Sequence, residues 1–260
     1  MYKIKFIIFI ALFTIFCSCN NFNSPKDGFK VEGNIENSQD CSQINAVMAF
    51  VPDHNAKISE SKLQNNYFSL FLPYEMEDKY CSAIGNNKYN LFEAEFENNL
   101  TISDKNVKIS KVYFSSDKEY LNDIQQLGYT EKLYDNDDVA FTFVKTKYIY
   151  AQSAVSVKGE YDTYTAQTPL LPTPLPKKMN FDLQLKKGWN VVYYVGYFVQ
   201  NTYYALEIDT ATIKITTEKP ENIELNWYYR ITQQSFFVLC KDTQMIPNMI
   251  HSCYYDFIVL

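Results

Sequence analysis

From Gly28 onward, apolar and polar residues alternate with a period of two along most of the chain. This spacing predicts β-strands with one buried face, because successive side chains of a strand point to opposite sides of the sheet. Turn residues separate the strands: Asn65-Asn66 opens one of them, and Gly188 supplies the positive φ that a hairpin requires. The expected strands cover residues 29–35, 44–51, 67–72, 89–97, 106–114, 138–144, 154–161, 180–185, 189–198, 203–208, 211–217 and 222–229.

Residues 115–128 interrupt this alternation with a helical pattern. Ser116 and Glu119 form a capping box, and Gly128 is a stop signal. Three apolar residues between them have helical spacing: Leu121, Ile124 and Leu127. We therefore expect one short helix here, followed by an acidic linker at residues 129–137.

The alternation as a whole predicts an all-β protein made of two antiparallel β-sandwich domains of the immunoglobulin or prealbumin type. The first domain covers residues 28–128 and ends in the short connecting helix, and the second covers residues 138–260. Residues 231–260 are apolar and lack the earlier rhythm of turns. They form either a last hairpin of the second sheet or sequence that does not match it.

Two short motifs occur in both halves of the chain. "KVEG" at 30–33 is similar to "SVKG" at 156–159, and "FSLFL" at 68–72 is similar to "FDLQL" at 181–185. The spacing between the two motifs differs, 35 residues against 22. Internal duplication would explain the likeness, and so would chance in a strand-rich sequence, so both interpretations stay open.

The N-terminus has the pattern of an export signal. Lys3 and Lys5 precede an apolar run at 6–16, and eleven residues are too few for a membrane helix, which needs about 20. Ser18 stands before Cys19. This pair resembles the cleavage site of bacterial lipoprotein signals, in which the cysteine receives the lipid.

The resemblance implies a signal peptide at 1–18, lipidation of Cys19 and a tether at 19–27. The acyl chains would attach the protein to the membrane, which places it in the bacterial cell envelope as an outer-membrane lipoprotein. Whether it faces the periplasm or the exterior is left open. An uncleaved anchor and ordinary secretion are the alternatives.

The charge of the chain restricts its partners. The net charge is −6, and loss of residues 1–18 removes two lysines and no acidic residue, so −6 becomes −8 in the mature chain. Arg230 is the only arginine, and the sequence contains no basic stripe. An acidic chain of this kind is a poor binder of nucleic acid, so we exclude nucleic acid as a partner.

Four cysteines follow the lipid site: Cys41, Cys81, Cys240 and Cys253. An exported protein can form disulfides, and four cysteines allow three pairings. We favour Cys41 with Cys81, because both are expected at ends of strands in the first domain; four thiols are the alternative. The chain has no CxxC motif, and His54 and His251 lie far apart, so we expect no metal site and no cofactor.

A family resemblance follows from six residues of the first domain: Val31, Gly33, Phe68, Leu70, Leu72 and Pro73. They resemble the carboxypeptidase-regulatory-like sandwich of Bacteroidetes surface proteins, which opens with Val-x-Gly and later runs Gly-x-Phe-x-Leu-x-Leu-Pro. Here Asn65-Asn66 replaces the usual glycine. The second half resembles Bacteroidales lipoproteins through "YAQSAVSVKG" at 150–159 and "LKKGWN" at 185–190. The resemblance implies interaction modules and not enzymes.

Catalytic motifs are missing from the sequence. There is no GxSxG, and no cysteine–histidine pair has a visible orienting group. Glu93, Glu95 and Glu97 alternate with apolar residues, as on the solvated face of a strand. Acidic residues at 135–138 lack the spacing of an EF-hand, so a turn with solvated charges is preferred over a calcium site. We therefore expect no catalytic residues.

Tyrosine clusters are the remaining candidates for binding. The chain has 22 Tyr and 19 Phe against 7 Gly, and adjacent aromatic residues of a strand point to opposite faces. Exposed rings can stack on sugars or contact a partner protein, whereas ordinary sheet packing is the alternative. The candidate ligand contacts are Tyr193, Tyr194, Tyr203, Tyr204 and Trp227.

These observations predict a non-enzymatic, lipid-anchored protein of the cell envelope. It would bind a glycan or an envelope protein through its tyrosine-rich second domain. The alternatives from other classes are a glycan-directed hydrolase that uses scattered carboxylates and a structural subunit of a fimbria-like surface assembly.

Overall fold

A computed structural model describes residues 27–36, 44–86, 100–117, 122–133, 138–164, 176–201 and 208–231. Within these ranges the chain forms β-strands and two short 3₁₀ turns, η2 (Pro52–His54) and η3 (Asp78–Tyr80), and no α-helix. The prediction of an all-β protein is therefore confirmed. A division into two sandwiches stays a prediction.

The strands belong to two sheets. β1 (Phe29–Asn34) and β4 (Tyr67–Leu72) form a two-stranded antiparallel sheet, and the large sheet has the order β3-β2-β7-β8-β9-β12-β13-β11-β10-β6, with β14 beside β8 and β5 beside β7. All pairs between named strands are antiparallel except β11 with β13. The other strands are β2 (Ala46–Val51), β3 (Ala56–Lys62), β5 (Ser82–Ala83), β6 (Thr101–Ile102), β7 (Lys108–Ser116), β8 (Asn122–Leu133), β9 (Asp138–Ala151), β10 (Val155–Tyr164), β11 (Pro176–Leu185), β12 (Gly188–Asn201), β13 (Ile208–Thr216) and β14 (Asn226–Ile231).

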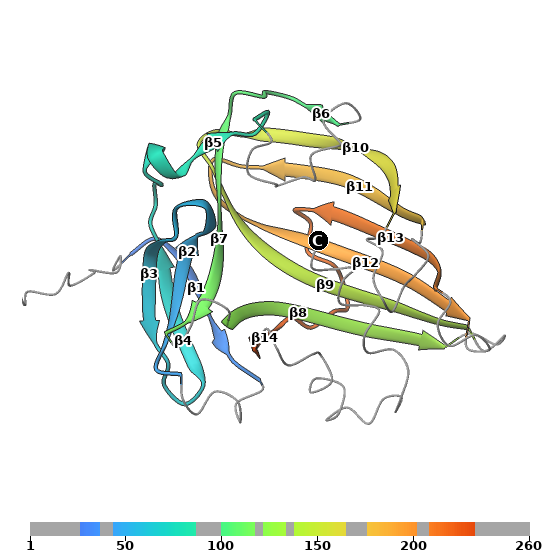
Figure 1. Ribbon diagram of the computed structural model, residues 1–260, viewed down its shortest axis with the longest axis horizontal. Coiled ribbons are helices and arrows are strands. Elements are labelled where there is room, and N and C mark those ends of the chain that lie inside the picture. The colour runs from blue at the N-terminus through green and yellow to red at the C-terminus, as the bar shows by residue number, and fades with distance from the viewer. Residues whose placement is uncertain are drawn as a thin grey trace, which may run out of the picture.

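Figure 1 shows β1 to β4 gathered at one end of the molecule, while the long strands β8 to β13 extend away from them. The core has two parts, one on each face of the large sheet. In β9, Tyr148 and Tyr150 belong to the first cluster of buried residues, whereas Ile149 and Ala151 belong to the second. The inner end of β9 is thus buried on both faces, as alternation of side chains along a strand requires.

Trp227 of β14 lies at the centre of the first cluster, where its side chain is 3% exposed. Its ring centroid lies 5.1 Å from that of Phe68 and 5.3 Å from that of Phe114, both edge-on, and 6.2 Å from the stacked ring of Tyr148. Its Nε1 donates a hydrogen bond of 3.1 Å to the Glu32 carbonyl oxygen. One indole therefore joins the small sheet to the large one.

The predicted helix at 115–128 is wrong. Ser116 ends β7, and residues from Asn122 onward form β8, which continues through 129–133 of the expected acidic linker. Ile124 lies opposite Phe114 in the first cluster, and β8 pairs with β9 and β14 over its length. These ladders, of which the one with β14 is long-range, outweigh a helix propensity that rests on a few local side chains.

Gly128 has a different role from the expected helix stop. A Cβ at this position would lie 2.5 Å from the Glu224 carbonyl oxygen and 2.5 Å from Cγ2 of Ile223. The missing side chain lets the segment before β14 approach the strand closely. The same lack of a side chain that weakens a helix therefore serves packing here.

The predicted turns are confirmed. Asn65 and Asn66 have φ values of +51° and +64°, and they connect β3 to β4. Gly188 has φ +93° at the start of β12. Asn190 supports that second turn, because its Nδ2 donates to the carbonyl oxygens of Lys186 and Gly188, each at 2.9 Å.

The two repeated motifs form ladders of the same register. In each ladder a valine lies opposite a leucine, and two residues later a glycine lies opposite a phenylalanine. The four pairs are Val31–Leu70, Gly33–Phe68, Val157–Leu183 and Gly159–Phe181. A match in sequence, register and order along the chain favours duplication over chance.

A first prediction concerns the contact between Gly33 and Trp227. A Cβ at Gly33 would lie 2.4 Å from Cδ1 of the indole. Gly33→Ala should lower the free energy of unfolding by about 1–3 kcal/mol, because it overpacks a filled core. Urea denaturation measures the change. Gly188→Ala separates crowding from backbone strain, because its Cβ would meet nothing within 4 Å and its cost would come from the positive φ of +93°. Equal stability of Gly33→Ala and the native chain would contradict the packing.

A second prediction concerns high pH. Burial, and then the neighbouring Tyr193, raise the pKa of Tyr148 above its ordinary value. The unfolded chain therefore loses this proton near pH 10, while the folded chain still holds it, so stability is complete below about pH 10 and falls above it by about 1.4 kcal/mol per pH unit for this group. Urea midpoints between about pH 8 and about pH 11 measure the effect. Tyr148→Phe should make the profile less steep, although burial also raises the pKa of Tyr193 and Tyr194, so part of the fall remains. An unchanged slope would contradict the assignment.

Candidate functional site

β12 leads from the first core to the surface. Alternate residues of this strand share one face of the large sheet. Trp189 at its inner end donates from Nε1 to the Pro73 carbonyl oxygen at 2.7 Å, and Val191 packs against the first cluster. Further along the same face, Tyr193 is half-buried and Tyr197 is 40% exposed. The face therefore changes from core to surface within one strand.

The register of five strands arranges this surface into three rows that run across β10, β11, β13, β12 and β9. We call these fifteen residues the tyrosine face. The first row is Lys158, Asp182, Thr216, Tyr193 and Thr146, the second is Glu160, Asn180, Lys214, Val195 and Val144, and the third is Asp162, Lys178, Thr212, Tyr197 and Thr142. Each tyrosine thus has a threonine on both neighbouring strands. Thr142 and Thr212 beside Tyr197 are half-buried, whereas Thr146 and Thr216 beside Tyr193 are buried, as is Val144.

Ion pairs occupy the β10–β11 side of the tyrosine face. Lys158 Nζ lies 3.7 Å from Asp182 Oδ1, and Lys178 Nζ lies 3.1 Å from Glu160 Oε2. All four side chains are more than a third exposed, so each pair contributes at most about 1 kcal/mol. Their consequence is electrostatic: positive and negative groups alternate, and the three lysines of the face match its three carboxylates in number.

Hydroxyl groups mark the border between the core and the tyrosine face. Tyr148 donates to Gln126 Oε1 at 3.4 Å, and Thr146 Oγ1 donates to the same oxygen at 3.2 Å. Burial raises the pKa of Tyr193, so its hydroxyl keeps its proton at neutral pH. These groups can donate and accept hydrogen bonds there without carrying charge.

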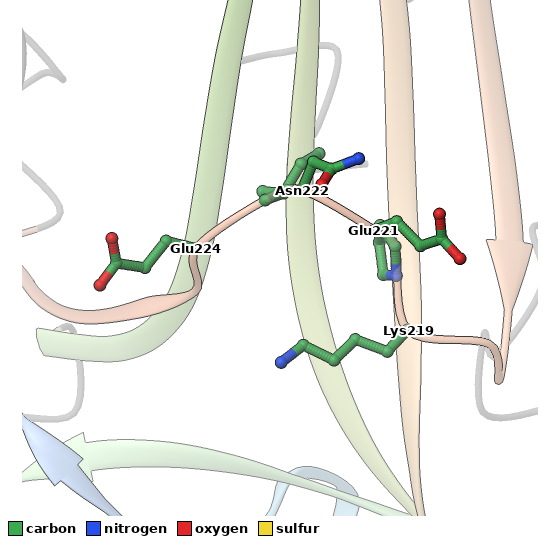
Figure 2. Close-up of a pocket in the computed structure, with 6 residues that line it drawn as sticks. Lys219, Glu221, Asn222 and Glu224 are labelled. Atoms are coloured by element: carbon green, nitrogen blue, oxygen red, sulfur yellow. The ribbon is translucent and has the colours of Figure 1, made fainter.

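A hollow of about 680 Å³ lies at the loop between β13 and β14, and the described residues that line it are Lys219, Pro220, Glu221, Asn222, Ile223 and Glu224. In Figure 2 the loop arches across the neighbouring strands. Lys219 extends beneath the arch, whereas the carboxylates of Glu221 and Glu224 point to either side. The hollow is open to solvent and polar at its rim.

The candidate ligand contacts separate in the structure. Tyr193 lies on the tyrosine face, whereas Tyr194 lies on the opposite face, where burial raises its pKa and Lys147 Nζ stands 4.2 Å from its ring centroid. Trp227 is a core residue and offers no surface to a ligand in this structure. Tyr203 and Tyr204 lie outside the described residues, as do Cys19 and Cys41.

Sequence reasoning missed Tyr197, Thr142 and Thr212. The signal was present for Tyr197, because it follows Tyr193 by four residues and so shares its face of a strand. No local signal exists for the threonines, since only the register of β9 and β13 with β12 brings them beside the ring.

Cys81 has a half-buried side chain, and burial together with the charge of Asp78 raises its pKa to about 11. The thiol is therefore protonated at neutral pH and a weak nucleophile. Asp78 itself accepts hydrogen bonds from Lys108 Nζ and, at 2.9 Å, from Gln152 Nε2. Pairing of Cys81 with Cys41 stays a prediction.

In the described part of the chain, no group of three or more His, Cys, Asp or Glu side chains is arranged to hold a metal ion. The same residues include no helix with the length and hydropathy needed to cross a membrane. Comparison with known proteins found no matching family model, no matching curated protein and no matching solved structure.

Proposed function

We propose that the protein is a lipid-anchored binding protein of the bacterial cell envelope, without enzymatic activity, and that the tyrosine face is its binding surface. One observation carries the proposal: Tyr193 and Tyr197 share one face of β12, and Tyr197 is 40% exposed between the half-buried Thr142 and Thr212. The matched ladders support a further step, in which each repeat belongs to its own sandwich-like unit.

The geometry of the face supports binding more than catalysis. Twelve of its fifteen residues reach the surface from five hydrogen-bonded strands, which gives a fixed and extended surface and not a cleft. A hydrolase needs two carboxyl groups that share a substrate bond. The carboxylates of Glu160 and Asp182 are instead engaged with lysines on the adjacent strand.

The edge of the sheet gives less support to a fimbria-like assembly. Strand addition requires an accessible edge with few charges. β10 pairs with β6 at Val157 and Lys158. Its next residues on the tyrosine face include Glu160 and Asp162, and charged side chains along an edge strand oppose addition of another strand.

A third prediction tests the anchor. Metabolic labelling with palmitate should mark the protein, and Cys19→Ala should abolish the label, because the acyl chains are attached at that residue. Cys17→Ala is the matched control and should leave the label in place. Labelled Cys19→Ala protein together with unlabelled Cys17→Ala protein would place the lipid at Cys17.

A fourth prediction tests the binding surface. The full chain, purified in detergent, is applied to a glycan array and to solubilised native envelope, beside Tyr197→Ala and Tyr74→Ala variants. Tyr74 is the matched control, since it is 67% exposed and lies in the loop after β4. Binding should be lost with Tyr197→Ala and kept with Tyr74→Ala.

Two results would contradict the proposal. Equal binding by the native chain and Tyr197→Ala would remove the tyrosine face from the site. Turnover of an array glycan that is lost on changing one acidic residue would establish the hydrolase instead.

A further inference from the structure

We propose that the ligand of the tyrosine face is an uncharged oligosaccharide that lies along β12 across Tyr197 and Tyr193. This inference rests on the proposed function and specifies the class of ligand. It follows from the spacing of the two rings, from the hydroxyl groups beside them and from the charge balance of the face.

The spacing of the rings favours an oligomer over a single sugar. Tyr193 and Tyr197 are four residues apart on one strand, which separates their positions by about 13 Å. One sugar ring does not cover this length, so separate units of one chain must meet the two aromatic rings. A tyrosine ring also suits this task because it offers apolar area with little loss of side-chain entropy.

The groups beside the rings suit a ligand rich in hydroxyls. Thr142 and Thr212 flank Tyr197, and both are half-buried, so they are placed on rigid backbone and still reach the surface. A threonine hydroxyl both donates and accepts, as a sugar hydroxyl does. Lys214 and Asn180 of the second row add further donors within the same face.

A raised loop borders the face on the β9 side. A Cβ at Gly128 would meet Cδ2 of Leu225 at 2.8 Å, and Gly128 pairs with Val144, which in turn pairs with Val195 of β12. The segment before β14 thus covers β8, which is the neighbour of β9 on the side away from β12. A chain bound along β12 would have this loop on one side and the open β13–β11–β10 surface on the other.

The charge balance argues against an anionic ligand. The three lysines of the face, Lys158, Lys178 and Lys214, are balanced by Glu160, Asp162 and Asp182, and Lys214 Nζ also lies 3.9 Å from Glu218 Oε2. A polyanion would gain no net attraction here, and the net charge of −6 would repel it.

The composition of the face argues against a protein partner. The buried centre of a protein interface is depleted in charged residues. Here six charged side chains on β10, β11 and β13 lie beside four apolar or aromatic residues, of which Val144 is buried, so that Tyr193, Val195 and Tyr197 remain for contact. Too little contiguous apolar surface is present for the core of such an interface.

The test is calorimetric titration of the full chain in detergent with neutral oligosaccharides of two to six units, including gluco-, xylo- and manno-oligosaccharides, and with anionic oligogalacturonides. We expect one neutral series to bind, with affinity that rises with chain length and does not change with salt. Tyr197→Ala should weaken that binding roughly fivefold or more, as truncation of an aromatic contact does. Tyr74→Ala should bind like the native chain, and thermal unfolding should show that both variants are folded.

Each other result would overturn the inference. Binding of oligogalacturonide that depends on Tyr197 and weakens with salt would reject a neutral ligand while keeping the tyrosine face as the site. Tyr197-dependent capture of an envelope protein, without sugar binding at millimolar concentration, would reject an oligosaccharide ligand and keep the tyrosine face as the site. Sugar binding that Tyr197→Ala leaves unchanged would reject both the inference and the proposed site.

Discussion

The insertion of Trp227 against Gly33 is the contact on which the rest of the structure depends. A two-stranded sheet such as β1–β4 is marginally stable by itself and needs another apolar surface to cover it. The indole supplies that surface, and its hydrogen bond to Glu32 spans 195 residues of chain. The contact is possible because Gly33 has no side chain where the ring lies. β14, the last described strand, thus holds β1, the first described strand, against the core.

This contact also determines where the tyrosine face begins. The small sheet covers the inner ends of β9 and β12, so Tyr148, Tyr150 and Trp189 pack beneath it. β9 and β12 pair over fourteen residues, which carries their outer ends beyond that cover. The same alternation that fills the first core therefore continues along β12 to Tyr197, which is 40% exposed.

Much of this fold could be predicted from the sequence, because strand alternation and turn chemistry are local. The turns at Asn65-Asn66 and Gly188 lie where their residues require them. The helix at 115–128 failed for the opposite reason: its spacing was local, whereas the pairing of β8 with β14 joins residues about a hundred positions apart. For the site, the sequence predicts which residues of β12 share a face, but it does not predict which face the small sheet covers. That choice depends on the position of Trp227, which the sequence pattern indicates as a ligand contact and the structure places in the core.

The two repeated ladders show how one motif serves two purposes. In both, Val-x-Gly pairs with Phe-x-Leu so that apolar residues share the inner face, and a slip of one residue would turn that set outward. Their outer faces are polar: Lys30 Nζ lies 2.7 Å from Glu32 Oε2 in the first, and Lys158 faces Asp182 in the second. The ladders differ in their neighbours. β11 pairs with β13 and so joins the large sheet, whereas the β1–β4 pair remains a separate layer. The motif fixes the register within a ladder, and its flanking strands decide whether the polar face becomes part of a wide surface.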